Sequence, residues 1–158
     1  MSGATTLGVR SESDDKVCAG AFLCHNGSIL LGLRSPDRSF YPGVWDAIGG
    51  HVRSTESPRE AVIRELDEEI QIVPTRLEEL AVLDEPRPDV NGKAKYHLFV
   101  VTEWTGPGPV ICGNEHSALK WFPLAEAVNL DLAHPDYPRL FTTLADRSVT
   151  PYHDDRSR

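Results

Sequence analysis

Two runs of apolar and β-branched residues, at 17–24 and 28–33, open the patterned part of the chain. Asn26-Gly27 separates them, and Asn-Gly is the strongest short signal for a β-hairpin because both residues tolerate positive φ. A shorter apolar run at 44–48 leads into Gly49-Gly50. We therefore predict a β-hairpin, then a loop and a third, short strand.

The clearest helix signal spans residues 57–70. Ser57 can cap the helix, Pro58 suits its first position, and Glu60 completes a capping box. Apolar residues then recur at helical spacing, at Val62, Leu66 and Ile70. This segment is predicted to be an amphipathic helix with one buried side.

Beyond this helix the pattern alternates between strands and helices. It predicts strands at 77–83, 95–104 and 119–122, a short helix at 123–128 and a final helix at 135–145. A proline-rich stretch with a second Asn-Gly, at Asn91-Gly92, joins the first two of these strands. Mixed strands and helices around one core predict the α/β (α+β) class.

The chain has 158 residues, enough for one domain. We expect this domain at 16–146, between a flexible N-terminal arm at 1–15 and a polar C-terminal tail at 147–158. The net charge of −8 argues against binding to duplex nucleic acid, because that binding is driven by cations that meet phosphates. A small phosphorylated ligand is compatible with this charge where a local cation neutralises it.

Three cysteines, Cys18, Cys24 and Cys112, include no CxxC pair. A disulfide framework or structural zinc site is therefore not expected, and the composition favours a cytoplasmic protein. The longest apolar runs fall far short of the ~20 residues of a membrane helix, so we expect no membrane partner.

Three carboxylates gather on one side of the predicted helix. At ~100° per residue, Glu65, Glu68 and Glu69 share an arc of ~100° at the margin of the apolar stripe. Like charges at this spacing repel, and by more where water is thinned out. Mg²⁺ would compensate them, because it prefers a few carboxylates together with substrate phosphates and water. The alternative is a solvated acidic face without a ligand.

The spacing upstream of the carboxylates favours the metal site. From Gly50 the chain has five residues, Glu56, seven residues, and then Arg64-Glu65-Leu66-x-Glu68-Glu69-x-Gln71-Ile72. This segment resembles the Nudix box, G-x5-E-x7-R-E-U-x-E-E-x-G-U, in which U is a bulky aliphatic residue. Eight of nine fixed positions match over 23 residues. The exception is Gln71, where the box has a glycine that would supply a left-handed residue at the helix end. Gln71 therefore bears on how the helix ends, and it removes no metal ligand.

The resemblance covers about residues 17–145 and implies the Nudix α/β/α sandwich around a mixed β-sheet. It also implies a ligand set for Mg²⁺, with Mn²⁺ as a substitute. This set consists of the carbonyl of Gly49 and the side chains of Glu65, Glu68 and Glu69. Glu65 and Glu69 would thereby act in catalysis.

Further catalytic and structural positions follow from the same resemblance. Arg64 would orient Glu65 through an ion pair. Gly50 and Glu56 would be structural, with Glu56 tying the loop to the helix. In the family a glutamate in a loop after the box often acts as the base, and Glu115 is the best placed here. Glu65 itself is the other candidate, and Glu115 would then be a solvated loop carboxylate.

Three residues before the box are candidates for binding substrate. Arg34 resembles a family position that touches substrate phosphate, although an exposed arginine is the alternative. Tyr41 and Trp45 could stack on a base. Aromatic residues at such positions more often anchor a core or a loop.

The resemblance is to the MutT-type members of the family. It implies Mg²⁺-dependent hydrolysis of a nucleoside triphosphate, such as 8-oxo-dGTP or another modified dNTP, to the monophosphate and pyrophosphate. The box does not separate this activity from hydrolysis of ADP-ribose or a nucleotide sugar. A domain that binds a nucleotide without cleaving it is a third alternative. Many family members dimerise, so a homodimer is a further expectation.

Overall fold

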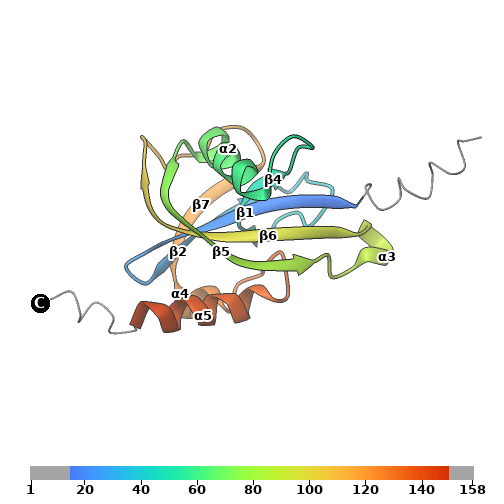
Figure 1. The fold of residues 1–158 in the computed structure, drawn as a ribbon. Helices are drawn as coiled ribbons and strands as arrows, with labels where there is room; N and C mark the ends of the chain where they lie inside the picture. The colour runs from blue at the N-terminus through green and yellow to red at the C-terminus, as the bar shows by residue number, and fades with distance from the viewer. Residues whose placement is uncertain (1–14, 150–158) are drawn as a thin grey trace, which may run out of the picture.

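The computed structural model describes residues 15–149. They form a seven-stranded mixed β-sheet with helices on both faces (Figure 1). The strands are β1 (Lys16–His25), β2 (Ser28–Arg34), β3 (Trp45–Asp46), β4 (Ile48–His51), β5 (Val73–Asp84), β6 (Ala94–Thr105) and β7 (His116–Pro123). The helices are α2 (Pro58–Ile70), α3 (Pro88–Asn91), α4 (Leu124–Ala127) and α5 (Tyr137–Val149). The predicted α+β class and the α/β/α sandwich are confirmed.

The central strand β1 changes its antiparallel partner along its length. One edge of β1 pairs in parallel with β6. At the other edge, residues 18–21 pair with β4 and residues 23–25 pair with β2. β2 also pairs with β7, and β5 with β6, both antiparallel. This exchange places Gly49 and Gly50 of β4 beside the first half of β1, where the site described below is built.

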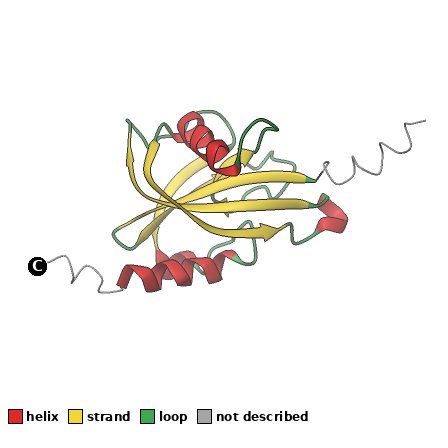
Figure 2. Ribbon diagram, in the orientation of Figure 1, coloured by secondary structure: helices red, strands yellow, loops and turns green. Residues whose placement is uncertain are grey.

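The two faces of the sheet bury separate cores. Figure 2 shows α2 on one face and α4 and α5 on the other. Successive side chains of β1 point to opposite faces, so Ala21 and Leu23 pack toward α2 whereas Phe22 packs toward α5. The apolar stripe predicted for α2 is buried in the first core, at Val62, Leu66 and Ile70. The position of α2 against the sheet follows from this stripe.

Both ends of α2 are capped. The backbone N–H of Glu60 donates to Ser57 Oγ at 3.1 Å, and that of Ser57 donates to Glu60 Oε1 at 2.9 Å, so the predicted capping box is confirmed. At the other end Gln71 is left-handed, with φ 61° and ψ 44°, and its N–H donates to the carbonyl of Asp67 at 3.2 Å. The helix therefore ends as it would with glycine, at a cost of about 1 kcal/mol for a residue with a side chain.

Some boundaries differ from the prediction. The strand predicted at 44–48 is two strands, because β3 pairs with β2 whereas β4 pairs with β1. The strand predicted at 119–122 begins earlier, at His116. Helix α5 continues to Val149, beyond the domain end expected at 146. Register with a neighbouring strand and packing against the sheet set these limits, and neither is visible in a local pattern.

The two predicted terminal segments are described only in part. Apart from Asp15, the arm predicted at 1–15 lies outside the described residues, as does the tail beyond Val149. Within residues 15–149, no helix is both long and apolar enough to span a bilayer.

Candidate active site

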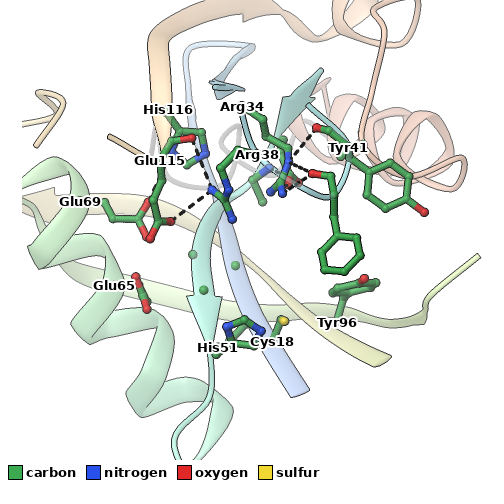
Figure 3. A pocket seen from close by; sticks show the side chains of 18 of the residues that line it. Cys18, Arg34, Arg38, Tyr41, His51, Glu65, Glu69, Tyr96, Glu115 and His116 are labelled. Atoms are coloured by element: carbon green, nitrogen blue, oxygen red, sulfur yellow. Dashed lines mark hydrogen bonds and ion pairs between the residues drawn. The ribbon is translucent and has the colours of Figure 1, made fainter. Parts of the chain in front are cut away.

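A cavity of about 540 Å³ lies where β1, β4 and α2 meet the loops after β2 and before β7. Figure 3 shows Glu65 and Glu69 on one side of it and Tyr41 and Tyr96 on the other. We call these sides the acidic end, formed by Glu65, Glu68, Glu69 and Glu115, and the tyrosine end, formed by Tyr41, Glu85, Asn91 and Tyr96. Most of the residues predicted for the site line this one cavity.

Arg64 organises the acidic end. Its guanidinium donates to both carboxylate oxygens of Glu56, at 2.9 Å from Nε and 2.7 Å from Nη2. It also donates to Glu65 at 3.1 Å, to Glu68 at 3.3 Å and to the carbonyl of His51 at 3.2 Å. Bidentate pairs of this kind fix the orientation of both partners. The ion pair predicted between Arg64 and Glu65 is thus present.

Glu56 joins the loop to the helix in the way the sequence predicts. Besides its bonds to Arg64, it accepts a hydrogen bond from the backbone N–H of Arg53 at 2.9 Å. The hydrogen bonds from Arg64 and then from Arg53 lower the pKa of Glu56 to about 2. Glu56 is therefore ionised at neutral pH and lies behind the cavity as a support for Arg64.

Glu69 is the least satisfied carboxylate of the site. Its side chain is 7% exposed, and neither oxygen has a hydrogen-bond partner among residues 15–149. Burial raises the pKa of Glu69, and the nearby carboxylates of Glu65 and Glu115 raise it further. A buried carboxylate in this position is costly unless a proton or a cation compensates it.

His116 gives Glu69 little charge compensation. His116 Nδ1 lies 3.4 Å from Glu69 Oε1. Burial lowers the pKa of His116, so the ring is neutral near pH 7. The pair is therefore a contact between a carboxyl group and a neutral imidazole. A neutral ring supplies no positive charge that could compensate an ionised Glu69.

The donor set of the acidic end fits a hard divalent cation. As the side chains stand, no group of three or more His, Cys, Asp or Glu in residues 15–149 is arranged to hold a metal ion, and Arg64 is paired with Glu65 and Glu68. The unpartnered oxygens of Glu69 nevertheless lie beside the carboxylates of Glu65 and Glu115, and all these candidate ligand atoms are oxygens. Gly50 leaves room for the Glu65 carboxylate, because a Cβ at Gly50 would come 2.5 Å from Glu65 Oε2. The ligand set of Gly49, Glu65, Glu68 and Glu69 stays a prediction.

Glu115 lies at the acidic end beside Glu69 (Figure 3). Its side chain is 47% exposed, and Arg38 Nη1 lies 3.7 Å from its Oε1. The backbone of Glu115 also accepts a hydrogen bond from Ser35 N at 3.1 Å. The structure thus brings Glu115 into the site, although the loop before β7 is far from the box in sequence, and its role as a base stays a prediction.

Arg34 lines the cavity, but most of its bonds are to the protein itself. Its guanidinium donates to the carbonyls of Phe40, at 2.6 Å from Nη2, and Tyr41, at 2.9 Å from Nε, and pairs with Asp46 at 3.2 Å. Arg34 therefore braces the loop after β2 against β3. Contact with a substrate phosphate stays a prediction for this residue.

The two aromatic candidates have different positions. Tyr41 lines the cavity with a positive φ of 52°, and its hydroxyl donates a hydrogen bond to Glu85. Trp45 is absent from the described residues that line the cavity, and its ring packs edge-on against Phe122 with centroids 4.9 Å apart. Because neighbours on a strand point to opposite faces, Asp46 faces the cavity and Trp45 faces the core.

Of the tyrosine end, sequence reasoning found Tyr41 and missed Glu85, Asn91 and Tyr96. Glu85 is 4% exposed and accepts hydrogen bonds from the hydroxyl of Tyr41 at 2.5 Å, from the hydroxyl of Tyr96, and from Asn91 Nδ2 at 3.0 Å. Burial alone would raise the pKa of Glu85, but these bonds and one from the backbone N–H of Arg87 lower it to about 2. The one signal available was an acidic residue directly after a strand, which is common in loops.

Comparisons with known proteins agree with this site. The NUDIX domain family model matches residues 15–144. Over 132 residues the chain is 35% identical to the CTP pyrophosphohydrolase of Escherichia coli (strain K12), a match that covers 83% of this chain and 93% of that protein. Over 88 residues it is 32% identical to the 8-oxo-dGTP diphosphatase of Proteus vulgaris, covering 56% of this chain and 76% of that protein. The crystal structure of a MutT NUDIX hydrolase from Burkholderia pseudomallei is 29% identical, with a TM-score of 0.66 over 87% of this chain and 99% of that one.

Proposed function

Because the chain belongs to the Nudix family and is a hydrolase of phosphoric anhydride bonds, we propose that it cleaves a nucleoside triphosphate to the monophosphate and pyrophosphate with Mg²⁺ bound. The relatives named above act on CTP and on 8-oxo-dGTP, which are both nucleoside triphosphates. A cavity of about 540 Å³ is within the range that holds a ligand of this size.

The observation that carries the proposal is the buried carboxylate of Glu69, which has no hydrogen-bond partner in residues 15–149. A chain that keeps such a group uncompensated loses stability unless something binds it. Glu65 and Glu115 beside it raise the pKa of Glu69 further, and we infer that the cation of the proposed reaction takes the place of a proton in compensating these carboxylates. This supports an enzyme whose carboxylates bind a metal ion, in preference to the alternative of a solvated acidic face without a ligand.

The residues of the acidic end have separate tasks in the proposed reaction. Mg²⁺, or Mn²⁺ in its place, would be held by Glu65, Glu68, Glu69 and the carbonyl of Gly49, and it supplies neutralisation of phosphate charge and a water of lowered pKa. Arg64 keeps the Glu65 carboxylate turned toward the cavity through the 3.1 Å ion pair.

Glu115 is the proposed general base. It is exposed enough to meet water, and Arg38 holds it at the rim of the acidic end. A carboxylate at this position could accept a proton from an attacking water that its neighbours have positioned. Glu115→Gln is therefore expected to lower kcat by about 10²-fold with a smaller effect on KM.

The test is hydrolysis by the purified protein with and without Mg²⁺, on CTP, 8-oxo-dGTP, the ordinary nucleoside triphosphates, ADP-ribose and nucleotide sugars. Glu69→Gln is expected to lower kcat on the preferred triphosphate by about 10³-fold, because it removes a charged oxygen from the cation site. Asp67→Asn is the matched control, since Asp67 is exposed on the same helix and lies outside the cavity lining.

Each outcome separates the candidate functions. Mg²⁺-dependent release of pyrophosphate that Glu69→Gln removes and Asp67→Asn keeps would support the proposal. Preferential cleavage of ADP-ribose or a nucleotide sugar would replace the triphosphate by a diphosphate-linked substrate. Nucleotide binding without turnover of any compound would contradict the proposed reaction.

A further inference from the structure

The tyrosine end of the cavity uses its hydrogen-bond donors internally. The hydroxyls of Tyr41 and Tyr96 both bond to the buried carboxylate of Glu85. Asn91 Nδ2 bonds to Glu85 Oε2 at 3.0 Å and to the Tyr41 hydroxyl at 3.1 Å. These residues come from the loop after β2, the end of β5, α3 and β6. They all line the cavity.

The direction of each bond follows from the charge of Glu85. Its hydrogen bonds outweigh its burial and hold its pKa at about 2, so the group is an ionised carboxylate at neutral pH. An ionised carboxylate only accepts hydrogen bonds. Each tyrosine hydroxyl has one hydrogen, and in this network that hydrogen points at Glu85. Only oxygen lone pairs remain for the cavity.

Asn91 contributes differently. Its two acceptors, Glu85 Oε2 and the Tyr41 hydroxyl, are themselves 2.5 Å apart, so one N–H of the amide is shared between them. Its carbonyl oxygen and its second N–H are left over. Tyr41 and Tyr96 therefore offer acceptors and no donors, whereas Asn91 keeps one of each. Glu85, which is only 4% exposed, thus determines from beneath the cavity surface which atoms the two tyrosine hydroxyls offer to a ligand.

We propose that the tyrosine end recognises the amino group of a nucleobase, so that the cavity favours cytosine over uracil. The inference rests on the proposed function only in that a nucleotide occupies the cavity. An amino group donates to the hydroxyl oxygens of Tyr41 and Tyr96, whereas a keto oxygen in the same place would face only the lone pairs of these two hydroxyls. A site that leaves buried polar atoms unpaired rejects the wrong group strongly. The N3–H of uracil and the sugar hydroxyls are the other donors that these nucleotides carry.

The test is the affinity for CMP, UMP and dCMP, measured by titration calorimetry in Mg²⁺ buffer. CMP and UMP differ at C4 of the base, an amino group against a keto oxygen, and at the adjacent N3, an acceptor against an N–H donor. Their binding requires no turnover. The wild-type protein is expected to bind CMP about 10-fold or more tightly than UMP. In Tyr96→Phe this ratio is expected to fall to within about threefold, because an acceptor is lost.

A second variant tests the role of Glu85. In Glu85→Gln the new amide nitrogen donates to a tyrosine hydroxyl, which frees that hydroxyl hydrogen to point into the cavity. The variant is expected to bind CMP more weakly and UMP more tightly. Asp84→Asn is the matched control, because Asp84 is the exposed neighbour of Glu85 and lies outside the cavity lining. It should leave the ratio unchanged.

Several results would overturn the inference. These are equal wild-type affinities for CMP and UMP, or a ratio that Tyr96→Phe does not change. Loss of discrimination between CMP and dCMP in Tyr96→Phe, with the CMP to UMP ratio kept, would assign the donor to the sugar and overturn the nucleobase assignment. If Glu85→Gln fails to fold, as judged by circular dichroism, Tyr96→Phe decides. Failure of triphosphate hydrolysis would leave these affinities measurable and so separates the two proposals.

Discussion

Two glutamates of the same cavity are almost equally buried but differ in their hydrogen-bond partners and in the direction of their pKa shifts. Glu69, on α2, is 7% exposed and has no hydrogen-bond partner in residues 15–149. Glu85, after β5, is 4% exposed and accepts bonds from two tyrosines, an asparagine and a backbone N–H. Burial raises the pKa of Glu69, whereas the bonds lower the pKa of Glu85 to about 2. Burial alone therefore does not decide the charge of a carboxylate; its donors do.

The difference separates a binding group from a supporting group. The requirements of Glu85 are met within the chain, so it stabilises the fold and orients its neighbours. Glu69 has no hydrogen-bond partner in residues 15–149, so its ionised form costs stability unless a proton or a cation compensates it. A functional site is where such a local conflict is expected.

The largest effect is expected from exchanging each carboxylate for its amide. Glu85→Gln should lower the free energy of unfolding by about 3 kcal/mol, because an amide nitrogen then meets hydroxyl and amide donors. In metal-free protein, Glu69→Gln should change stability little, because the raised pKa of Glu69 favours an uncharged carboxyl group, which an amide of similar size replaces. Urea unfolding at pH 7 measures both. Equal losses of unfolding free energy in the two variants would contradict the difference proposed between Glu69 and Glu85.

The second prediction concerns acid. The pKa of Glu85 in the folded protein, about 2, lies below its ordinary value of 4.5, so its stabilisation is present above pH 4.5 and is lost as the pH falls toward 2. The stability advantage of the wild-type protein over Glu85→Gln should shrink by roughly 2 kcal/mol between pH 5 and pH 3. Urea unfolding across that range measures it. An advantage that stays constant would show that Glu85 is not ionised through this network.

A smaller effect is expected from the cation. Mg²⁺ at about ten times its dissociation constant should stabilise the wild-type protein by about 1.4 kcal/mol, which raises Tm by a few degrees. The shift should vanish in Glu69→Gln and persist in Glu85→Gln, because only Glu69 lacks a partner. Thermal unfolding with Mg²⁺ and with Mn²⁺ measures it. A shift that survives in Glu69→Gln would place the cation elsewhere.

The smallest effect concerns the end of α2. Gln71→Gly should raise the free energy of unfolding by about 0.5 kcal/mol, because glycine adopts φ 61° without strain but loses more freedom on folding. The Mg²⁺-induced rise in Tm should not change. Such a result would show that the behaviour of Glu69 depends on its surroundings and not on how the helix ends.

Three carboxylates of the acidic end, Glu65, Glu68 and Glu69, could be grouped from the sequence because they lie in one contiguous segment. The box spans 23 residues from Gly50 to Ile72, and helical geometry alone brings its carboxylates onto one arc. The Arg64 to Glu56 pair follows from the same local loop and helix. Trp45 shows the limit of such reasoning. A strand period places Trp45 and Asp46 on opposite faces, but it does not say which face the cavity occupies.

By itself, the sequence determined α2 with its cap, the grouping of its carboxylates and the family to which the chain belongs. Only the tertiary structure decided which carboxylates find partners. The donors to Glu85 come from segments up to 44 residues away in the chain, and the neighbours that crowd Glu69 include Glu115 from the loop before β7. Hydrogen-bond satisfaction depends on distances in space, and a chain brings distant segments to those distances only when it folds.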